Sequence, residues 1–136
     1  IVKREGRSIN DIFASDGEEA FRRIEHEAVL EAAELDGCVI ATGGGVVLNK
    51  DNIAALRKNG VIVNLAPDFS VIASRLKDAM STRPLLRDGE LEDIHKRFKD
   101  RLPFYADCDI SIDVINGRTP RSYAIEILDL CERKGR

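Results

Sequence analysis

The stretch Val39-Ile40-Ala41-Thr42-Gly43-Gly44-Gly45-Val46-Val47 decides how the fold of this chain is interpreted. An apolar run that ends in consecutive glycines is typical of a buried strand followed by a turn of bare backbone. Glycine has no Cβ, so its backbone turns freely and can approach a ligand within hydrogen-bond distance. Ligands in open α/β sheets bind just beyond the carboxyl ends of the strands. We therefore predict a small polar ligand at Gly43, Gly44 and Gly45, although three glycines alone fit a flexible turn equally well.

Strand and helix patterns alternate along the rest of the chain. Short apolar runs predict buried parallel strands over 38–41 and 61–66, and a period-two pattern predicts a strand near a sheet edge over 109–114. Helices are expected over 16–35 and after Thr119-Pro120, where a cap is followed by proline at the first helical position. This alternation predicts the α/β class, with a right-handed parallel sheet flanked by helices. Three strands are few for this class, so a piece of the sheet is expected to be missing.

The composition argues against several kinds of partner. The 136 residues are 43% hydrophobic and 33% charged, and the formal charge of −3 gives no basic field for nucleic acid or anionic lipid. No apolar run approaches the length of about 20 residues that a membrane span requires. Cys38, Cys108 and Cys131 lie far apart, so we expect reduced, mostly buried thiols of a cytoplasmic protein and no metal site. A small-molecule partner is therefore expected, with no nucleic acid and no membrane, and the oligomeric state is not predicted.

Charged residues on the helix over 16–35 have two interpretations. Arg22 and Glu25 are three residues apart and so lie on one face of that helix. From the residues alone they are surface charges, and Glu18 and Arg22 form an i,i+4 ion pair of the kind that helix faces often carry. A binding role for Arg22 and Glu25 needs a further argument.

Five segments follow one another along the chain: Gly6-Arg7-Ser8-Ile9 with Asp11-Ile12-Phe13, Asp16-Gly17-Glu18 with Phe21-Arg22-Arg23-Ile24-Glu25, Ala41-Thr42-Gly43-Gly44-Gly45-Val46, Arg83-Pro84-Leu85-Leu86, and Arg101-Leu102-Pro103-Phe104-Tyr105. In identity and order they resemble the shikimate kinase family over nearly the whole chain. The resemblance implies a P-loop kinase fold of the nucleoside monophosphate kinase-like type with a five-stranded parallel sheet. It also implies transfer of the γ-phosphoryl of ATP to the 3-hydroxyl of shikimate, with Mg²⁺. The implied domain spans 1–136, with substrate-binding helices over 1–35, a lid over 77–90 and the core in the remainder.

The resemblance implies a substrate-binding role for several residues. Arg22 and Arg101 would bind the shikimate carboxylate, because the fork of donors on a guanidinium matches a carboxylate. Glu25 would orient the guanidinium of Arg22 and the substrate end of the site. The backbone amides of residues 43–45 would contact the ring hydroxyls, where a side chain would push the substrate away. Arg101 is expected at the end of a helix, just before a turn at Pro103.

The resemblance also implies a lid over 77–90, where the regular pattern of the chain lapses into polar residues, glycine and proline. Arg83 would swing over the transferring phosphoryl group, adding positive charge and excluding water. Pro84 and Leu85 would pack on the substrate side. Arg118 would lie near the adenine of ATP.

The chain departs from the family pattern in one respect. It has neither a Gly-x-x-x-x-Gly-Lys-[Ser/Thr] loop, which binds phosphates and Mg²⁺, nor the Asp-x-Asp segment that supplies the aspartate for the substrate hydroxyl. We therefore expect an N-terminally truncated shikimate kinase that lacks the main ATP and Mg²⁺ ligands. The 136-residue chain by itself is expected to be inactive and to show no measurable binding of ATP.

Two other functions stay open. One is a non-catalytic module that binds shikimate, or an interaction module, without ATP chemistry. The other is a different small-metabolite P-loop kinase, such as a relative of gluconate kinase, whose sugar substrate has no carboxylate held by the same arginine pair.

Overall fold

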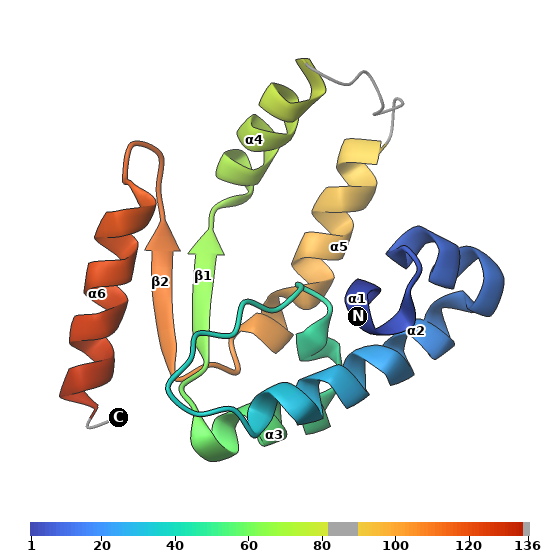
Figure 1. The fold of residues 1–136 in the computed structure, drawn as a ribbon. Coiled ribbons are helices and arrows are strands. Elements are labelled where there is room, and N and C mark those ends of the chain that lie inside the picture. The colour runs from blue at the N-terminus through green and yellow to red at the C-terminus, as the bar shows by residue number, and fades with distance from the viewer. Residues whose placement is uncertain (82–89, 135–136) are drawn as a thin grey trace. The chain divides into compact units, whose positions relative to one another are not determined.

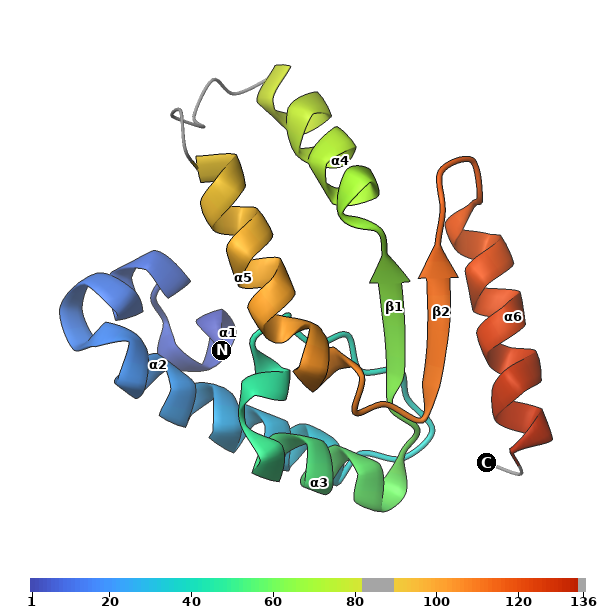
Figure 2. The same cartoon turned by 180° about the vertical axis from the view of Figure 1, so that it is seen from behind.

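The structure is a computed structural model that describes residues 1–81 and 90–134. The chain divides into two compact units, residues 1–60 and residues 61–136, and each unit is described by itself. The elements of both can be followed in Figure 1 and, from behind, in Figure 2. Within the described residues, no helix combines the length and the apolar character needed to cross a bilayer.

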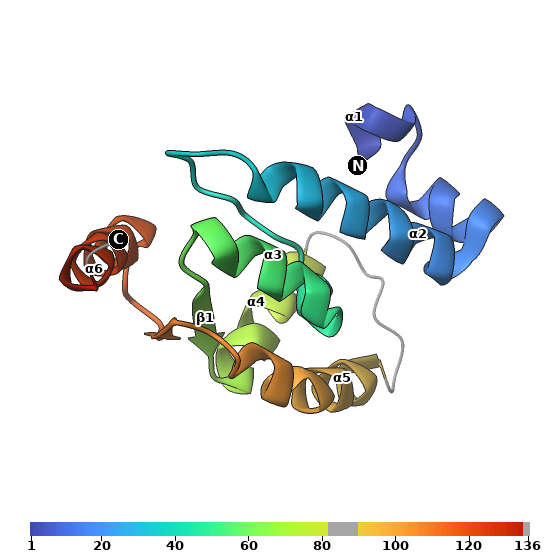
Figure 3. The same ribbon diagram turned by 90° about the horizontal axis from the view of Figure 1, so that it is seen from below.

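The first unit is built from helices. It contains α1 (Val2–Glu5), α2 (Ile9–Ala33), a short 3-10 helix η1 (Val46–Leu48) and α3 (Lys50–Asn59). Helices α2 and α3 lie side by side (Figure 3). The apolar side chains buried in this unit are Ile12, Phe21, Val29, Ala33, Val46, Ile53 and Leu56.

Helix α2 begins with a capping box and contains one kink. The Ser8 hydroxyl accepts a hydrogen bond from the Asp11 backbone N–H at 3.1 Å, and the Asp11 carboxylate accepts one from the Ser8 backbone N–H at 3.2 Å. At Gly17 the backbone has φ 82° and ψ 175°, a conformation that glycine adopts readily and other residues avoid. The predicted helix start at Asp16 therefore corresponds to the kink. The Asp16 side chain accepts a hydrogen bond from Arg7.

The second unit is built on two parallel strands. Strand β1 (Val63–Pro67) pairs with β2 (Ile110–Val114) in a register that sets Leu65 opposite Ile112. Helix α4 (Phe69–Ser81) follows β1, α5 (Glu90–Tyr105) precedes β2, and α6 (Pro120–Arg133) packs along β2 (Figure 1). These elements confirm the α/β class with a parallel sheet flanked by helices.

Strand β2 alternates between buried and exposed residues, as its period-two sequence predicted. Ile110, Ile112 and Val114 face a core that includes Tyr123 of α6. The Tyr123 hydroxyl donates to the carbonyl oxygen of Ile115 at 3.0 Å and accepts from its N–H at 2.8 Å. Helix α6 begins with the predicted Thr119 cap and Pro120 at its first position.

Residues 38–41 do not form the buried strand that their sequence predicted. Val39 is 98% exposed, and Cys38 is an exposed free thiol, whereas Cys108 and Cys131 are half-buried. A strand forms where a neighbouring strand takes up its backbone hydrogen bonds. In the described residues the sheet consists of β1 and β2 alone, and residues 38–41 take no part in its pairing. The prediction of mostly buried cysteines is wrong for Cys38.

The turn predicted at Pro103 is also absent, because α5 continues through Pro103 to Tyr105. Proline removes one backbone donor, and its cost is highest in the middle of a helix. Pro103 lies in the last turn, and the helix stays closed beyond it because the Ala106 N–H donates to the Leu102 carbonyl at 3.0 Å. Arg101 therefore lies one turn before the end of α5.

Candidate functional site

Arg22 and the glycine turn at residues 43–45 come together in the first unit. A Cβ placed on Gly45 would lie 2.9 Å from Nη2 of Arg22 and still closer to Nη1. A side chain at position 45 would therefore collide with the guanidinium. By contrast, a Cβ placed on Gly43 would meet nothing within 4 Å. Two of the predicted site segments thus form one surface, although 20 residues of chain separate them.

Two carboxylates hold the guanidinium of Arg22. Its Nη1 donates to Glu25 at 2.7 Å, and its Nη2 donates to Glu18 at 3.2 Å. Glu25 is 7% exposed, whereas the Glu18 side chain is 66% exposed. The ion pair between Glu18 and Arg22 is the one expected from the i,i+4 spacing, and an exposed pair of this kind stabilises little. The pair with Glu25 is different, because it lies at the buried edge of α2.

The charge state of Arg22 follows from these contacts. Burial by itself lowers the pKa of Arg22, but the hydrogen bond and charge of Glu25, together with those of Glu18, outweigh burial and raise the pKa. The guanidinium therefore stays cationic and can bind an anion at any physiological pH.

The backbone of the glycine turn is closed by its own hydrogen bonds. The Val46 N–H donates to the Gly43 carbonyl at 3.2 Å, and the Leu48 N–H donates to the Gly45 carbonyl at 3.1 Å. The side chain of Val46 is buried beneath the turn. The turn therefore keeps its shape without side chains at the glycines.

The remaining predicted site residues lie elsewhere in the chain. Arg101 is half-buried in α5 of the second unit, so its predicted convergence with Arg22 stays a prediction. Arg83, Pro84 and Leu85 lie outside the described residues. The roles predicted for them depend on the sequence alone.

Arg118 precedes α6 and is fixed by two contacts. Its Nη2 donates to Glu126 at 2.7 Å, and its guanidinium carbon lies 4.3 Å from the ring centroid of Tyr123. A guanidinium over an aromatic face is stabilised by the ring quadrupole. These contacts give Arg118 a structural role at the start of α6, and its predicted place near an adenine stays a prediction.

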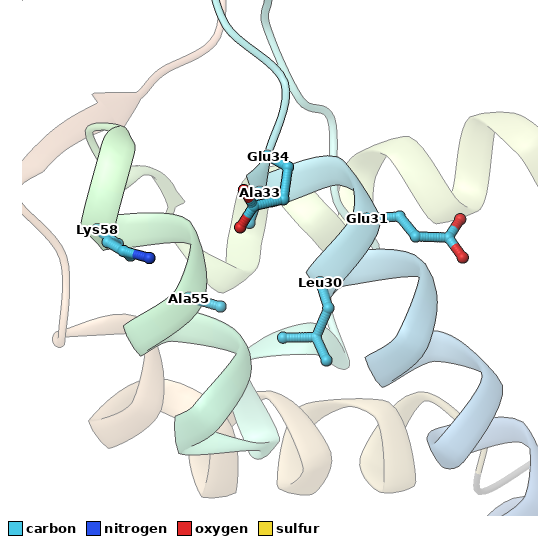
Figure 4. A pocket seen from close by; sticks show the side chains of 6 residues that line it. All are labelled: Leu30, Glu31, Ala33, Glu34, Ala55 and Lys58. Carbon is cyan, nitrogen blue, oxygen red and sulfur yellow. The ribbon is translucent and has the colours of Figure 1, made fainter.

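A hollow of about 480 Å³ opens between α2 and α3 (Figure 4). Its lining side chains are Leu30, Glu31, Ala33, Glu34, Ala55 and Lys58. None of the predicted site residues is among them. Over the described residues, no group of three or more His, Cys, Asp and Glu side chains is arranged to hold a metal ion.

Sequence reasoning missed Asn52, the polar side chain that supports the glycine turn. Asn52 is 1% exposed and donates from Nδ2 to the carbonyl oxygen of Val46 at 3.1 Å. Asparagine is mostly a surface residue, so its presence near the start of a helix gives no signal of burial. Only the packing of α3 against the turn reveals it.

Known proteins resemble this chain over nearly its whole length. The sequence profile of the family described as "Shikimate kinase" matches residues 1–132. The shikimate kinase of Caldicellulosiruptor bescii is 41% identical over 133 residues, which cover 96% of this chain and 75% of that protein. The shikimate kinase of Geobacter metallireducens is 41% identical over 133 residues, which cover 97% of this chain and 73% of that protein.

Solved structures give a similar result. The shikimate kinase of Acinetobacter baumannii in complex with shikimate superimposes with a TM-score of 0.82 at 28% identity, covering 98% of this chain and 74% of that one. The shikimate kinase of Aquifex aeolicus superimposes with a TM-score of 0.77 at 30% identity, covering 98% of this chain and 76% of that one.

Proposed function

This chain belongs to the shikimate kinase family, and we propose that Arg22, Glu25 and the glycine turn at residues 43–45 form its shikimate-binding surface. The family has a P-loop kinase fold and transfers the γ-phosphoryl of ATP to the 3-hydroxyl of shikimate, which gives ADP and a phosphate ester. The observation that carries the proposal is the guanidinium of Arg22 lying against Gly45.

The chemistry of shikimate matches this surface. Shikimate carries a carboxylate and three hydroxyls on one ring, so it needs a cationic fork and a row of hydrogen-bonding groups. Arg22 supplies the fork, and the glycine backbone supplies the hydroxyl contacts. Because the pair with Glu18 is exposed, a substrate carboxylate can displace Glu18 from Nη2 while Glu25 keeps its hold on Nη1.

The proposal extends to residues of the other segments. Arg101 is assigned to the same carboxylate, Arg83 to the transferring phosphoryl group, Pro84 and Leu85 to the substrate side of a lid, and Arg118 to the adenine side. These assignments are supported by the resemblance of the motifs that contain these residues. The substrate-binding helices over 1–35 and the lid over 77–90, within one domain of 136 residues, belong to the same proposal.

The family uses ATP and Mg²⁺. The described residues hold no group of three or more potential metal ligands, and the sequence contains no Gly-x-x-x-x-Gly-Lys-[Ser/Thr] loop. The proposal therefore assigns no residue of this chain to Mg²⁺ or to a phosphate-binding loop.

Shikimate as the small-molecule partner and a cytoplasmic location complete the proposal. A reducing compartment keeps thiols unpaired, and all three cysteines of the chain are free.

The proposal is tested by measuring shikimate affinity with Arg22→Ala and Arg101→Ala in the intact protein. Each change weakens binding by about 2 to 5 kcal/mol, the usual loss when one partner of a buried charge pair is removed. The matched control is Arg23→Ala, because Arg23 is the next residue on α2 and is exposed. Equal affinity in Arg22→Ala and the parent would overturn the assignment. It would favour a P-loop kinase whose substrate has no carboxylate.

A further inference from the structure

His26 of α2 and Asn52 of α3 form a polar network next to the residues assigned to shikimate. Nδ1 of His26 lies 2.6 Å from Oδ1 of Asn52, and Nδ2 of Asn52 donates to the carbonyl oxygen of Val46 at 3.1 Å. Asn52 is fully buried, so its polar atoms depend on these partners for their hydrogen bonds. Val46 directly follows Gly45. The network therefore links α2 to the glycine turn through one buried amide.

The chemistry of the groups fixes the direction of each hydrogen bond. A carbonyl oxygen can only accept, so the amide nitrogen of Asn52 faces Val46 and its oxygen faces His26. Nδ1 of His26 must therefore carry a proton and donate it to Asn52. The amide nitrogen of Asn49 lies farther from Nδ1, at 3.4 Å. The contact of His26 with Asn52 is the shorter of the two and decides the tautomer.

The network and Arg22 act on neighbouring residues of the same turn. His26 lies four residues after Arg22, on the same face of α2. Arg22 contacts Gly45 directly, and His26 reaches Val46 through Asn52. The N–H of Val46 in turn donates to the carbonyl of Gly43. Helix α2 thus holds the glycine turn at two adjacent positions.

We propose that His26 and Asn52 are positioning residues, which hold the glycine turn against Arg22 so that one shikimate molecule can contact both. The inference rests on the proposed function of the Arg22 surface. Neither residue touches the substrate. Without the amide of Asn52 the Val46 carbonyl keeps only the backbone N–H of Asn49, at 3.4 Å, as a donor, so the turn is held less firmly against α3 and shifts. A shifted turn cannot contact the ring hydroxyls while Arg22 holds the carboxylate. Binding both ends of shikimate at once requires that the turn and the guanidinium are aligned with each other.

The test uses two substitutions of His26 in the intact protein. His26→Gln keeps an N–H that can donate to Asn52, whereas His26→Phe keeps a ring but has no donor. At saturating ATP, His26→Phe is expected to raise the KM for shikimate about tenfold, the effect of one unmade buried hydrogen bond. His26→Gln is expected to restore the parent value, and the KM for ATP is expected to stay unchanged in both variants. A merely structural role would instead give Phe and Gln the same effect.

A second pair of variants keeps the inference testable if a His26 variant does not fold. Asn52→Leu removes the buried amide and is expected to raise the KM for shikimate. Asn59→Leu is the matched control, because Asn59 also lies on α3 and donates its amide to a carbonyl of α2, that of Ala33 at 3.5 Å. This control is expected to leave the KM for shikimate unchanged.

The possible failures can be told apart. The inference is overturned if His26→Phe keeps the parent KM for shikimate, if His26→Gln behaves like His26→Phe, or if Asn59→Leu has the effect of Asn52→Leu. In those cases Arg22→Ala still loses shikimate binding and the proposed function stands. If Arg22→Ala keeps the parent affinity, the proposed function and this inference both fail.

Discussion

The guanidinium of Arg22 fills the space that a side chain at Gly45 would need. A Cβ at this position would therefore displace the end of the arginine side chain before any ligand is bound. Gly43 differs, because the space around its missing Cβ is open. The two glycines of one motif thus differ in what an added side chain would meet.

Alanine at these two positions should have different consequences. Gly45→Ala is expected to displace the guanidinium of Arg22 and to weaken shikimate binding by about 1 to 3 kcal/mol, the cost of losing a well-placed hydrogen-bonding group. Gly43→Ala is expected to leave the Tm unchanged, so any loss of affinity in that variant comes from contact with the substrate. Titration calorimetry with shikimate and thermal unfolding measure the two effects. Parent affinity in Gly45→Ala would contradict the role given to Arg22.

The two carboxylates beside Arg22, those of Glu25 and Glu18, should contribute unequally to shikimate binding. Glu25→Gln removes a buried charge from the hydrogen bond that orients the guanidinium, and is expected to weaken shikimate binding about tenfold, in line with the strength of charge-assisted hydrogen bonds. Glu18→Gln serves as the control, because an exposed pair is worth less than about 1 kcal/mol. The affinity of both variants for shikimate checks the prediction. A larger loss in Glu18→Gln than in Glu25→Gln would reverse the assignment.

The stability of the start of α2 should depend on its N-cap residue, Ser8. Ser8→Ala is expected to lower the free energy of unfolding by about 1 kcal/mol, because the N–H of Asp11 loses its acceptor. Ser8→Gly is the matched variant, since glycine is tolerated at this position at a cost of only about a few tenths of a kcal/mol. Urea unfolding of the two variants measures the difference. Equal stability of Ser8→Ala and Ser8→Gly would show that the cap does not stabilise the helix.

The ion pair of Asp16 with Arg7 should make stability fall in acid. The hydrogen bond from Arg7 is the largest cause that lowers the pKa of Asp16, so the folded chain holds the ionised carboxylate more strongly than the unfolded chain. The resulting stabilisation is fully present above the unfolded pKa of about 3.9 and is lost as the pH falls through the lower folded value. Unfolding of the parent and Asp16→Asn should therefore differ at pH 7 and converge in acid. A difference that grows as the pH falls would contradict this linkage.

The sequence predicted those parts of the fold that depend on local patterns. The alternation in β2 and the Thr119-Pro120 helix start each involve residues a few positions apart, and the structure has both. Two predictions failed because they depended on what lies nearby in space. Residues 38–41 needed a neighbouring strand, and Pro103 was tolerated because it falls in the last turn of α5.

The candidate site also has some features that the sequence predicted and others that only the structure shows. Arg22, Glu25 and the glycines could be named from the sequence, because their residue types and spacing match a known motif. That Glu25 is buried while Glu18 is exposed, and that Asn52 lies beneath the turn, could not be read from residue types that mostly lie on protein surfaces.

The sequence alone determined the family, the parallel α/β class and the chemical groups available for a carboxylate ligand, because these follow from residue identity and short-range order. The tertiary structure alone decided that the guanidinium of Arg22 lies against Gly45 and that Asn52 holds Val46 in place. The contact of Arg22 with Gly45 joins segments that lie 20 or more residues apart in the sequence. The contact of Asn52 with Val46 involves a buried asparagine, a residue type that mostly lies on protein surfaces. They exist only when α2, the glycine turn and α3 pack together, since packing sets which polar groups lose water and must find each other.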